Sequence, residues 1–243
     1  MTPLINNYSR LAGKTVAWDT SDSEKVFLQN TQNPHTRQAL ESLGFLNTSV
    51  EYRFNSHGFR TAEFDQQCDV VCFGCSFTMG TGVHDKDTWP SQLQSLTGLQ
   101  VVNLGHAGSS NDTAFRYAQH YLPLLRPKHA IWLQTDMHRL ELVDDAATVN
   151  LNIIAGDTKN PCANDYFIKV WFTSVTNQLI NLHKNTLAFE SLCKSLHIRP
   201  VVLPRETVPM HGPFPSGRAR DLTHPGADTY KIIAGKAIDQ IIN

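Results

Sequence analysis

Hydrophobic and polar positions form regular patterns mainly from residue 69 onward. Four short apolar runs, bounded by polar or glycine positions, predict buried strands at 69–74, 100–104, 129–134 and 199–203. Longer stretches with helical spacing predict helices at 88–96, 111–125, 164–197 and 226–242. Strands that alternate with helices in this way are typical of a parallel sheet with helices on both faces. We therefore expect the α/β class and a three-layer α/β/α fold.

The predicted helices carry end signals and apolar stripes. Thr88 is placed to cap the helix at 88–96, and Pro90 lies in its first turn. We expect two stripes to face the core. The first contains Ile168, Trp171, Phe172, Val175, Leu179 and Leu182. The second contains Ala227, Tyr230, Ile233, Ala234, Ala237, Ile238 and Ile241.

The first fifty residues are polar and only weakly periodic, with one short helix predicted at 35–44. We expect residues 1–50 to form an arm or small cap on a main domain at 51–243. Residues 140–163 are predicted to be an insertion or lid, and residues 204–220 an irregular loop.

Composition and charge exclude several classes of protein. The chain has 243 residues, of which 41 % are hydrophobic and 18 % charged, and this excludes disorder and coiled coil. Its 21 basic and 22 acidic residues give a net charge of −1 without a basic block, so no nucleic-acid partner is expected. No apolar run approaches the ~18 residues of a membrane helix, and residues 1–14 lack a signal-peptide pattern. We expect a protein without a membrane span; its location is cytoplasmic or unknown, and its oligomeric state stays open.

Five cysteines, an odd number, favour reduced thiols. Cys68, Cys72 and Cys75 have the C-x3-C-x2-C spacing by which radical SAM enzymes hold an iron–sulfur cluster. Such a cluster needs three thiolates that converge, whereas a strand spreads these three over roughly 23 Å. We therefore interpret them as small buried hydrophobes, and no histidine spacing indicates a metal. No cofactor is expected.

The candidate chemistry lies in loops that follow the predicted strands. Ligands bind at the carboxyl ends of parallel strands, so the loops at 74–82, 105–111 and 134–139 are expected to meet. Ser76 lies in the first loop, and Asp221 and His224 lie three residues apart before the last helix. A serine becomes a useful nucleophile when a base accepts its proton and a third group orients that base. The pattern predicts Ser76 as nucleophile, His224 as base and Asp221 as the group that orients it.

Together, these segments resemble the SGNH (GDSL-type) hydrolases. The resemblance rests on GCSFT (74–78), NLGHAG (103–108), DLTHPG (221–226) and an upstream NS-x-GFR-like segment, YRFNSHGFRTAEF (52–64). It implies a flavodoxin-like α/β/α fold, a Ser-His-Asp triad that acts on acyl esters, and no metal or cofactor. By the same resemblance, the N–H groups of Ser76 and Gly108 would hold the oxyanion.

Two positions depart from the family pattern. Cys75 replaces the aspartate before the serine, and residues 134–137 read QTDM where the family has G-x-N-D. An ionised Asp136 can accept but not donate a hydrogen bond, and its charge would oppose an oxyanion. The amide role therefore passes to Asn111 or Gln134, or the site works with two backbone donors, or catalysis is impaired. If Asp136 takes the asparagine position, Asp136→Asn is expected to raise turnover.

Three functions stay open at this point. The first is a serine esterase that cleaves an acyl ester, with an O-acetyl group on a carbohydrate as a candidate substrate. The second is an O-acyltransferase that uses the same triad. The third is a non-catalytic carbohydrate-binding or structural module of this fold.

Overall fold

The centre of the molecule is a parallel sheet. The computed structural model describes residues 9–64, 67–143, 150–153, 166–209 and 217–242. Its four-stranded sheet has the order β4-β3-β5-β8. These strands are β3 (Val70–Gly74), β4 (Val101–Gly105), β5 (His129–Leu133) and β8 (Arg199–Leu203). In chain order this is 2-1-3-4, as at the start of a flavodoxin-like sheet. The predicted strands and the α/β class are confirmed.

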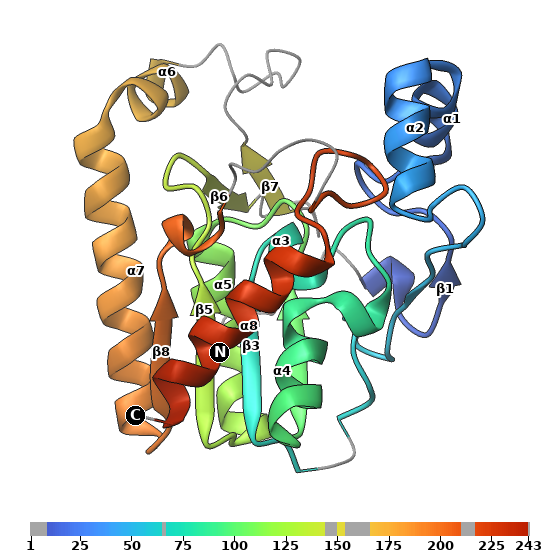
Figure 1. The fold of residues 1–243 in the computed structure, drawn as a ribbon. Helices are drawn as coiled ribbons and strands as arrows, with labels where there is room; N and C mark the ends of the chain where they lie inside the picture. The colour runs from blue at the N-terminus through green and yellow to red at the C-terminus, as the bar shows by residue number, and fades with distance from the viewer. Residues whose placement is uncertain (1–8, 65–66, 144–149, 154–165, 210–216, 243) are drawn as a thin grey trace.

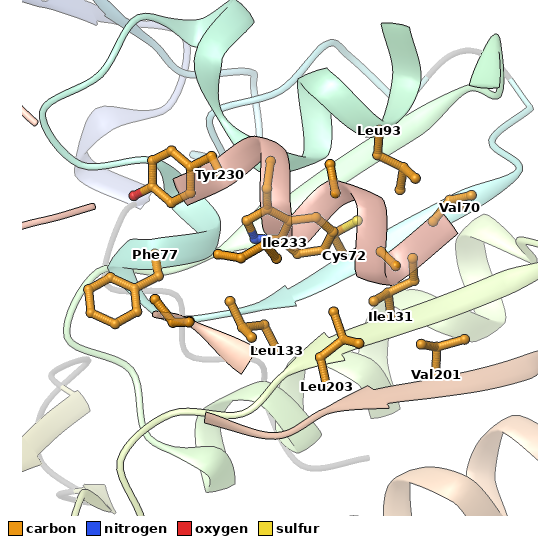
Figure 2. Close-up of a cluster of buried hydrophobic side chains, with 14 of the residues drawn as sticks. Val70, Cys72, Phe77, Leu93, Ile131, Leu133, Val201, Leu203, Tyr230 and Ile233 are labelled. Carbon is orange, nitrogen blue, oxygen red and sulfur yellow. The ribbon is translucent and has the colours of Figure 1, made fainter. Parts of the chain in front are cut away.

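Helices cover both faces of this sheet (Figure 1). One face carries α4 (Trp89–Thr97) and α8 (Ala227–Ile242), and the other carries α5 (Asn111–Leu125) and α7 (Val175–Ser195). Figure 2 shows the core under α8, where Ile233 packs above Cys72, Ile131 and Leu133. The predicted three layers are confirmed. Among the described residues, no helix has the length and apolar character needed to cross a bilayer.

The cysteines at 68–75 are divided between the two cores. Cys72 and Cys75 pack under α8, whereas Cys68 belongs to the core on the side of α5 and α7. Burial raises the pKa of the Cys68 thiol to about 11 and that of Cys72 well above its usual value. The described thiols are free and buried. Within the described ranges, no group of three or more His, Cys, Asp or Glu side chains is arranged to hold a metal ion.

The apolar stretch at 164–197 forms two helices rather than one. α6 (Tyr166–Thr173) ends before Ser174, whose hydroxyl caps α7 by accepting from the N–H of Asn177. The predicted core positions Val175 and Leu179 are 55 % and 42 % exposed, so that part of the stripe is wrong. The buried face of α7 begins instead with three amide side chains, Gln178, Asn181 and Asn185.

Two of these buried amide side chains face a carboxylate at the start of α5. Asn181 and Asn185 each donate to Oδ1 of Asp112, at 2.9 and 2.8 Å. A carboxylate in a helix–helix interface needs hydrogen-bond donors, and α7 supplies them from Asn181 and Asn185. Gln178 donates instead to the carbonyl of Trp171 on α6. The stripe predicted for α8 is confirmed at five positions, while Ala227 is exposed and Ile238 is partly buried.

The remaining elements are short. Thr88 caps α4 as predicted, and the helix predicted at 35–44 is α2 (Pro34–Ser42). α1 (Glu24–Gln32), which buries no residue, was not predicted. β1 (Thr15–Val16) pairs antiparallel with β2 (Tyr52–Arg53) across the predicted boundary at residue 50, which stays a prediction.

The predicted insertion and loop are described only in part. β6 (Leu140–Val143) and β7 (Asn150–Ile153) form an antiparallel pair within the predicted insertion. A 3-10 turn, η4 (Arg205–Thr207), begins the loop predicted at 204–220. Residues 144–149, 154–165 and 210–216 lie outside the described residues.

Candidate active site

Ser76 lies where β3 passes directly into the short helix α3 (Ser76–Met79). This helix lies tightly against the end of β4, because a Cβ on Gly105 would overlap the backbone of Thr78 and Met79. Glycine at 105 therefore permits the close approach. As the first residue of the helix, Ser76 has an N–H group without an intrahelical acceptor. Its side chain lies at the carboxyl edge of the sheet.

His224 joins Ser76 to Asp221. Its Nε2 lies 2.9 Å from Oγ of Ser76, and its Nδ1 lies 2.6 Å from Oδ2 of Asp221. With the proton on Nδ1, the ring donates to Asp221 and accepts from Ser76, which is the tautomer a general base requires. The edge of the ring meets Phe77, with centroids 5.6 Å apart. The three predicted catalytic residues form one chain of hydrogen bonds.

Asp221 is buried and ionised. Burial opposes its ionisation, but hydrogen bonds and charge from His224, with a backbone hydrogen bond from Thr223, hold its pKa well below the usual range. The N–H groups of Thr223 and His224 donate to its Oδ1 at 3.0 and 2.9 Å. Leu222, between Asp221 and Thr223, has a φ of 57°, an unfavourable conformation for a leucine. Such strain is typical of functional sites.

The loop at 105–111 is hydrogen-bonded to the end of β3 at Gly74. His106 N–H and Ser109 Oγ–H both donate to the carbonyl of Gly74, at 2.9 and 3.1 Å. Gly108 between them has a φ of 77°, which glycine adopts without strain. In the described part of the chain, the N–H groups of Ser76 and Gly108 carry no hydrogen bond. Both backbone donors therefore remain available to an oxyanion.

The two amide side chains considered for the oxyanion are engaged elsewhere. Asn111 donates to the carbonyl of Thr135 at 3.2 Å and accepts from the N–H of that residue at 3.0 Å. Gln134 donates to the hydroxyl of Thr186 on α7 at 2.9 Å. Asn111 thus joins the second loop to the third, and the geometry favours two backbone donors.

Asp136 is paired with two arginines. Its Oδ1 accepts from Nε of Arg205 at 3.0 Å, and its Oδ2 lies 3.5 Å from Nη2 of Arg139. The guanidinium of Arg205 lies 4.8 Å above the ring of Phe77, next to Ser76. These cations offset part of the charge by which Asp136 is expected to oppose an oxyanion, and the effect on the oxyanion stays a prediction.

The ion pairs of Asp136 change the result expected for the Asp136→Asn variant. We expect its turnover of p-nitrophenyl acetate to be no higher than that of the wild type. We expect its free energy of unfolding to fall by about 1 kcal/mol, as for a partly exposed ion-pair network. Hydrolysis rates and thermal melts measure both. The control is Glu190→Gln, at an exposed carboxylate on α7. A faster Asp136→Asn enzyme would show that the carboxylate opposes the reaction after all.

His106 is a buried histidine with a structural role. Its Nδ1 lies 2.6 Å from the hydroxyl of Tyr117 on α5. Burial, together with the charge of Arg116, lowers its pKa to about 3. The ring therefore stays neutral near pH 7 and ties the second loop to α5.

Two residues near the triad were missed by sequence reasoning. Ser21 donates from its hydroxyl to Oδ2 of Asp221 at 2.8 Å, although the two are 200 positions apart. Its surroundings predict only a helix start, because Ser23 caps α1. Arg205 also gives no local signal, because its contacts with Asp136 and Phe77 arise from the fold alone.

No protein-family model matches the sequence, and no curated protein matches it. The fold is similar to three solved structures that cover 71–72 % of this chain and 94–98 % of their own. TesA shares 10 % identity at a TM-score of 0.47. A member of the lipolytic G-D-S-L family from Veillonella parvula shares 12 % at 0.35, and a Clostridium thermocellum family 3 carbohydrate esterase 11 % at 0.37. All three TM-scores lie below 0.5, so the evidence for a chemical activity is the geometry of the side chains alone.

Proposed function

We propose that this protein is a serine esterase that hydrolyses acyl esters at Ser76. The observation that carries the proposal is the hydrogen-bond chain from Oγ of Ser76 through His224 to the buried Asp221. A hydroxyl within hydrogen-bond reach of a base, itself oriented by a carboxylate, is the arrangement that activates serine.

The first half of the reaction transfers the acyl group to Ser76. Oγ bonds to the ester carbonyl carbon while its proton passes to Nε2 of His224. The carbonyl oxygen becomes an oxyanion, which the N–H groups of Ser76 and Gly108 stabilise. When the tetrahedral intermediate collapses, the alcohol leaves with the proton from His224.

The second half releases the acid. Water gives a proton to His224 and attacks the acyl carbon, and Ser76 then departs with that proton. Throughout, Asp221 holds the ring in position and stabilises the imidazolium. The candidate substrate is an acyl ester, including an O-acetyl group on a carbohydrate. If a sugar hydroxyl replaces water in this half, the same residues perform acyl transfer.

Labelling with a fluorophosphonate tests the proposal. The phosphorus bonds to the activated serine oxygen and fluoride leaves, so we expect one added mass on the peptide that contains Ser76. The Ser76→Ala protein is the control and should take up no label. An unlabelled wild type would favour a non-catalytic module. Acetylated sugar, formed from p-nitrophenyl acetate with a sugar present, would indicate a transferase.

A further inference from the structure

The N-terminal segment reaches the triad. Besides donating to Oδ2 of Asp221 at 2.8 Å, the hydroxyl of Ser21 lies 3.4 Å from Nδ1 of His224. Asp221 therefore accepts four hydrogen bonds, two at Oδ1 from backbone N–H groups and two at Oδ2 from side chains. A carboxylate offers about four lone-pair positions. Ser21 supplies the last donor.

A buried ion pair fixes Ser21 in this position. The next residue, Asp22, accepts from Nε and Nη2 of Arg220 at 2.9 and 2.7 Å, and Arg220 directly precedes Asp221. Residues 21 and 22 thus bind residues 221 and 220 in two adjacent contacts. Asp22 and Arg220 are only 1 % and 3 % exposed. A desolvated pair of this kind is stable only when its geometry is good and its remaining polar atoms are satisfied.

Those polar atoms are satisfied by neighbours from the first 82 positions of the chain. Nη2 of Arg220 also donates to the carbonyl of Ala17 at 2.6 Å, and its guanidinium lies 3.8 Å above the ring of Trp18. The hydroxyl of Tyr52 donates to Asp22 at 2.5 Å and accepts from the N–H of Gly82 at 2.7 Å. Burial, then the charge of Asp22, raises the pKa of Tyr52, so its hydroxyl keeps its proton. These contacts hold the backbone next to Ser21 in place and so fix its position.

We propose that Ser21 is a positioning residue of the proposed esterase site and acts on His224 through Asp221. Its hydroxyl holds Oδ2 of Asp221 against rotation and withdraws negative charge from that oxygen. Without it, Oδ2 attracts the imidazolium of His224 more strongly. The acid limb of the rate profile then moves to higher pH, because the base keeps its proton to a higher pH.

The test uses three variants of the full chain. We expect Ser21→Ala to lower kcat about tenfold and to change KM by less than about twofold, because the hydroxyl orients a catalytic group rather than substrate. The acid limb of kcat/KM should move to higher pH. Ser21→Thr keeps a hydroxyl and should restore most of the rate. Ser23→Ala is the control, because Ser23 caps α1 through Val26 and lies in the same segment.

Ser21 is exposed, so Ser21→Ala should melt at the wild-type temperature. An unchanged kcat and pH profile in Ser21→Ala would overturn the proposal. So would a Ser21→Thr rate as low as that of Ser21→Ala, or equal losses of rate and melting temperature in Ser21→Ala and Ser23→Ala.

The proposal rests on the proposed function, and a measurement without turnover separates the two. NMR titration of the His224 ring reports its proton directly. If Ser76 takes no fluorophosphonate but Ser21→Ala still moves this titration to higher pH, the esterase proposal fails and the positioning role stands. If Ser76 is labelled and the titration does not move, the esterase stands and the role of Ser21 is refuted.

Discussion

Ser76→Ala is expected to lose essentially all esterase activity and to keep its fold. Removing a triad serine costs on the order of 10⁶ in kcat in a serine protease, and we expect at least about 10³ for an activated ester such as p-nitrophenyl acetate. The side chain is 6 % exposed, and its hydroxyl contacts His224 and, weakly, Cys75. Its removal therefore leaves little unsatisfied, so the melting temperature should change little.

Release of p-nitrophenol and a thermal melt measure both effects. The control is Ser195→Ala, at an exposed position in the last turn of α7. It should match the wild type. Substantial hydrolysis by Ser76→Ala would place the nucleophile elsewhere and remove the basis of the proposed function.

Asp221→Asn is expected to lower kcat about 10⁴-fold, the loss that follows when a triad carboxylate becomes an amide. An amide nitrogen facing Nδ1 of His224 donates where a carboxylate accepts, so it favours the tautomer that cannot take the serine proton. The amide also has one acceptor oxygen for the four donors that now face Asp221. We therefore expect a lower melting temperature as well.

The pH dependence follows from the charge state of Asp221. Because its pKa is held well below the usual range, the carboxylate stays ionised from pH 8 to pH 5. Its contribution to stability is complete above the unfolded value of ~3.9 and is lost only as the pH falls through the lower folded value. Between pH 8 and pH 5, protonation of Asp221 should therefore contribute nothing to any change in the wild-type rate. An Asp221→Asn enzyme at the wild-type rate would contradict the triad.

The sheet and most helices were predictable because their signals are local. The buried strands are short apolar runs, and Thr88 is recognisable in the sequence as the residue that caps α4. The proximity of Ser76, His224 and Asp221 was also predictable, since strand ends place Ser76 at the edge of the sheet and three-residue spacing joins Asp221 to His224.

The misread parts depend on contacts that are distant in sequence. Asn181 and Asn185 lie on the buried face of α7 because Asp112 on α5 needs donors, and nothing within 175–195 reveals that demand. Ser21 gives no signal for the same reason, because its partner lies 200 positions away. The sequence alone predicts an uncompensated charge at Asp136, because its partner Arg205 lies 69 positions away.

The pairing of residues 21 and 22 with residues 221 and 220 also orders the folding of this chain. These contacts span 200 and 198 positions and so carry a high loop-closure entropy, which slows their formation. During synthesis from the N-terminus, Asp22 and Tyr52 emerge first and stay without Arg220 until the 198 positions that separate Asp22 from Arg220 have been made. The carboxylate of Asp221 therefore gains its full set of donors only when residues 21 and 221 have met. Enzymatic activity in a refolding experiment would report that final long-range step rather than formation of the sheet.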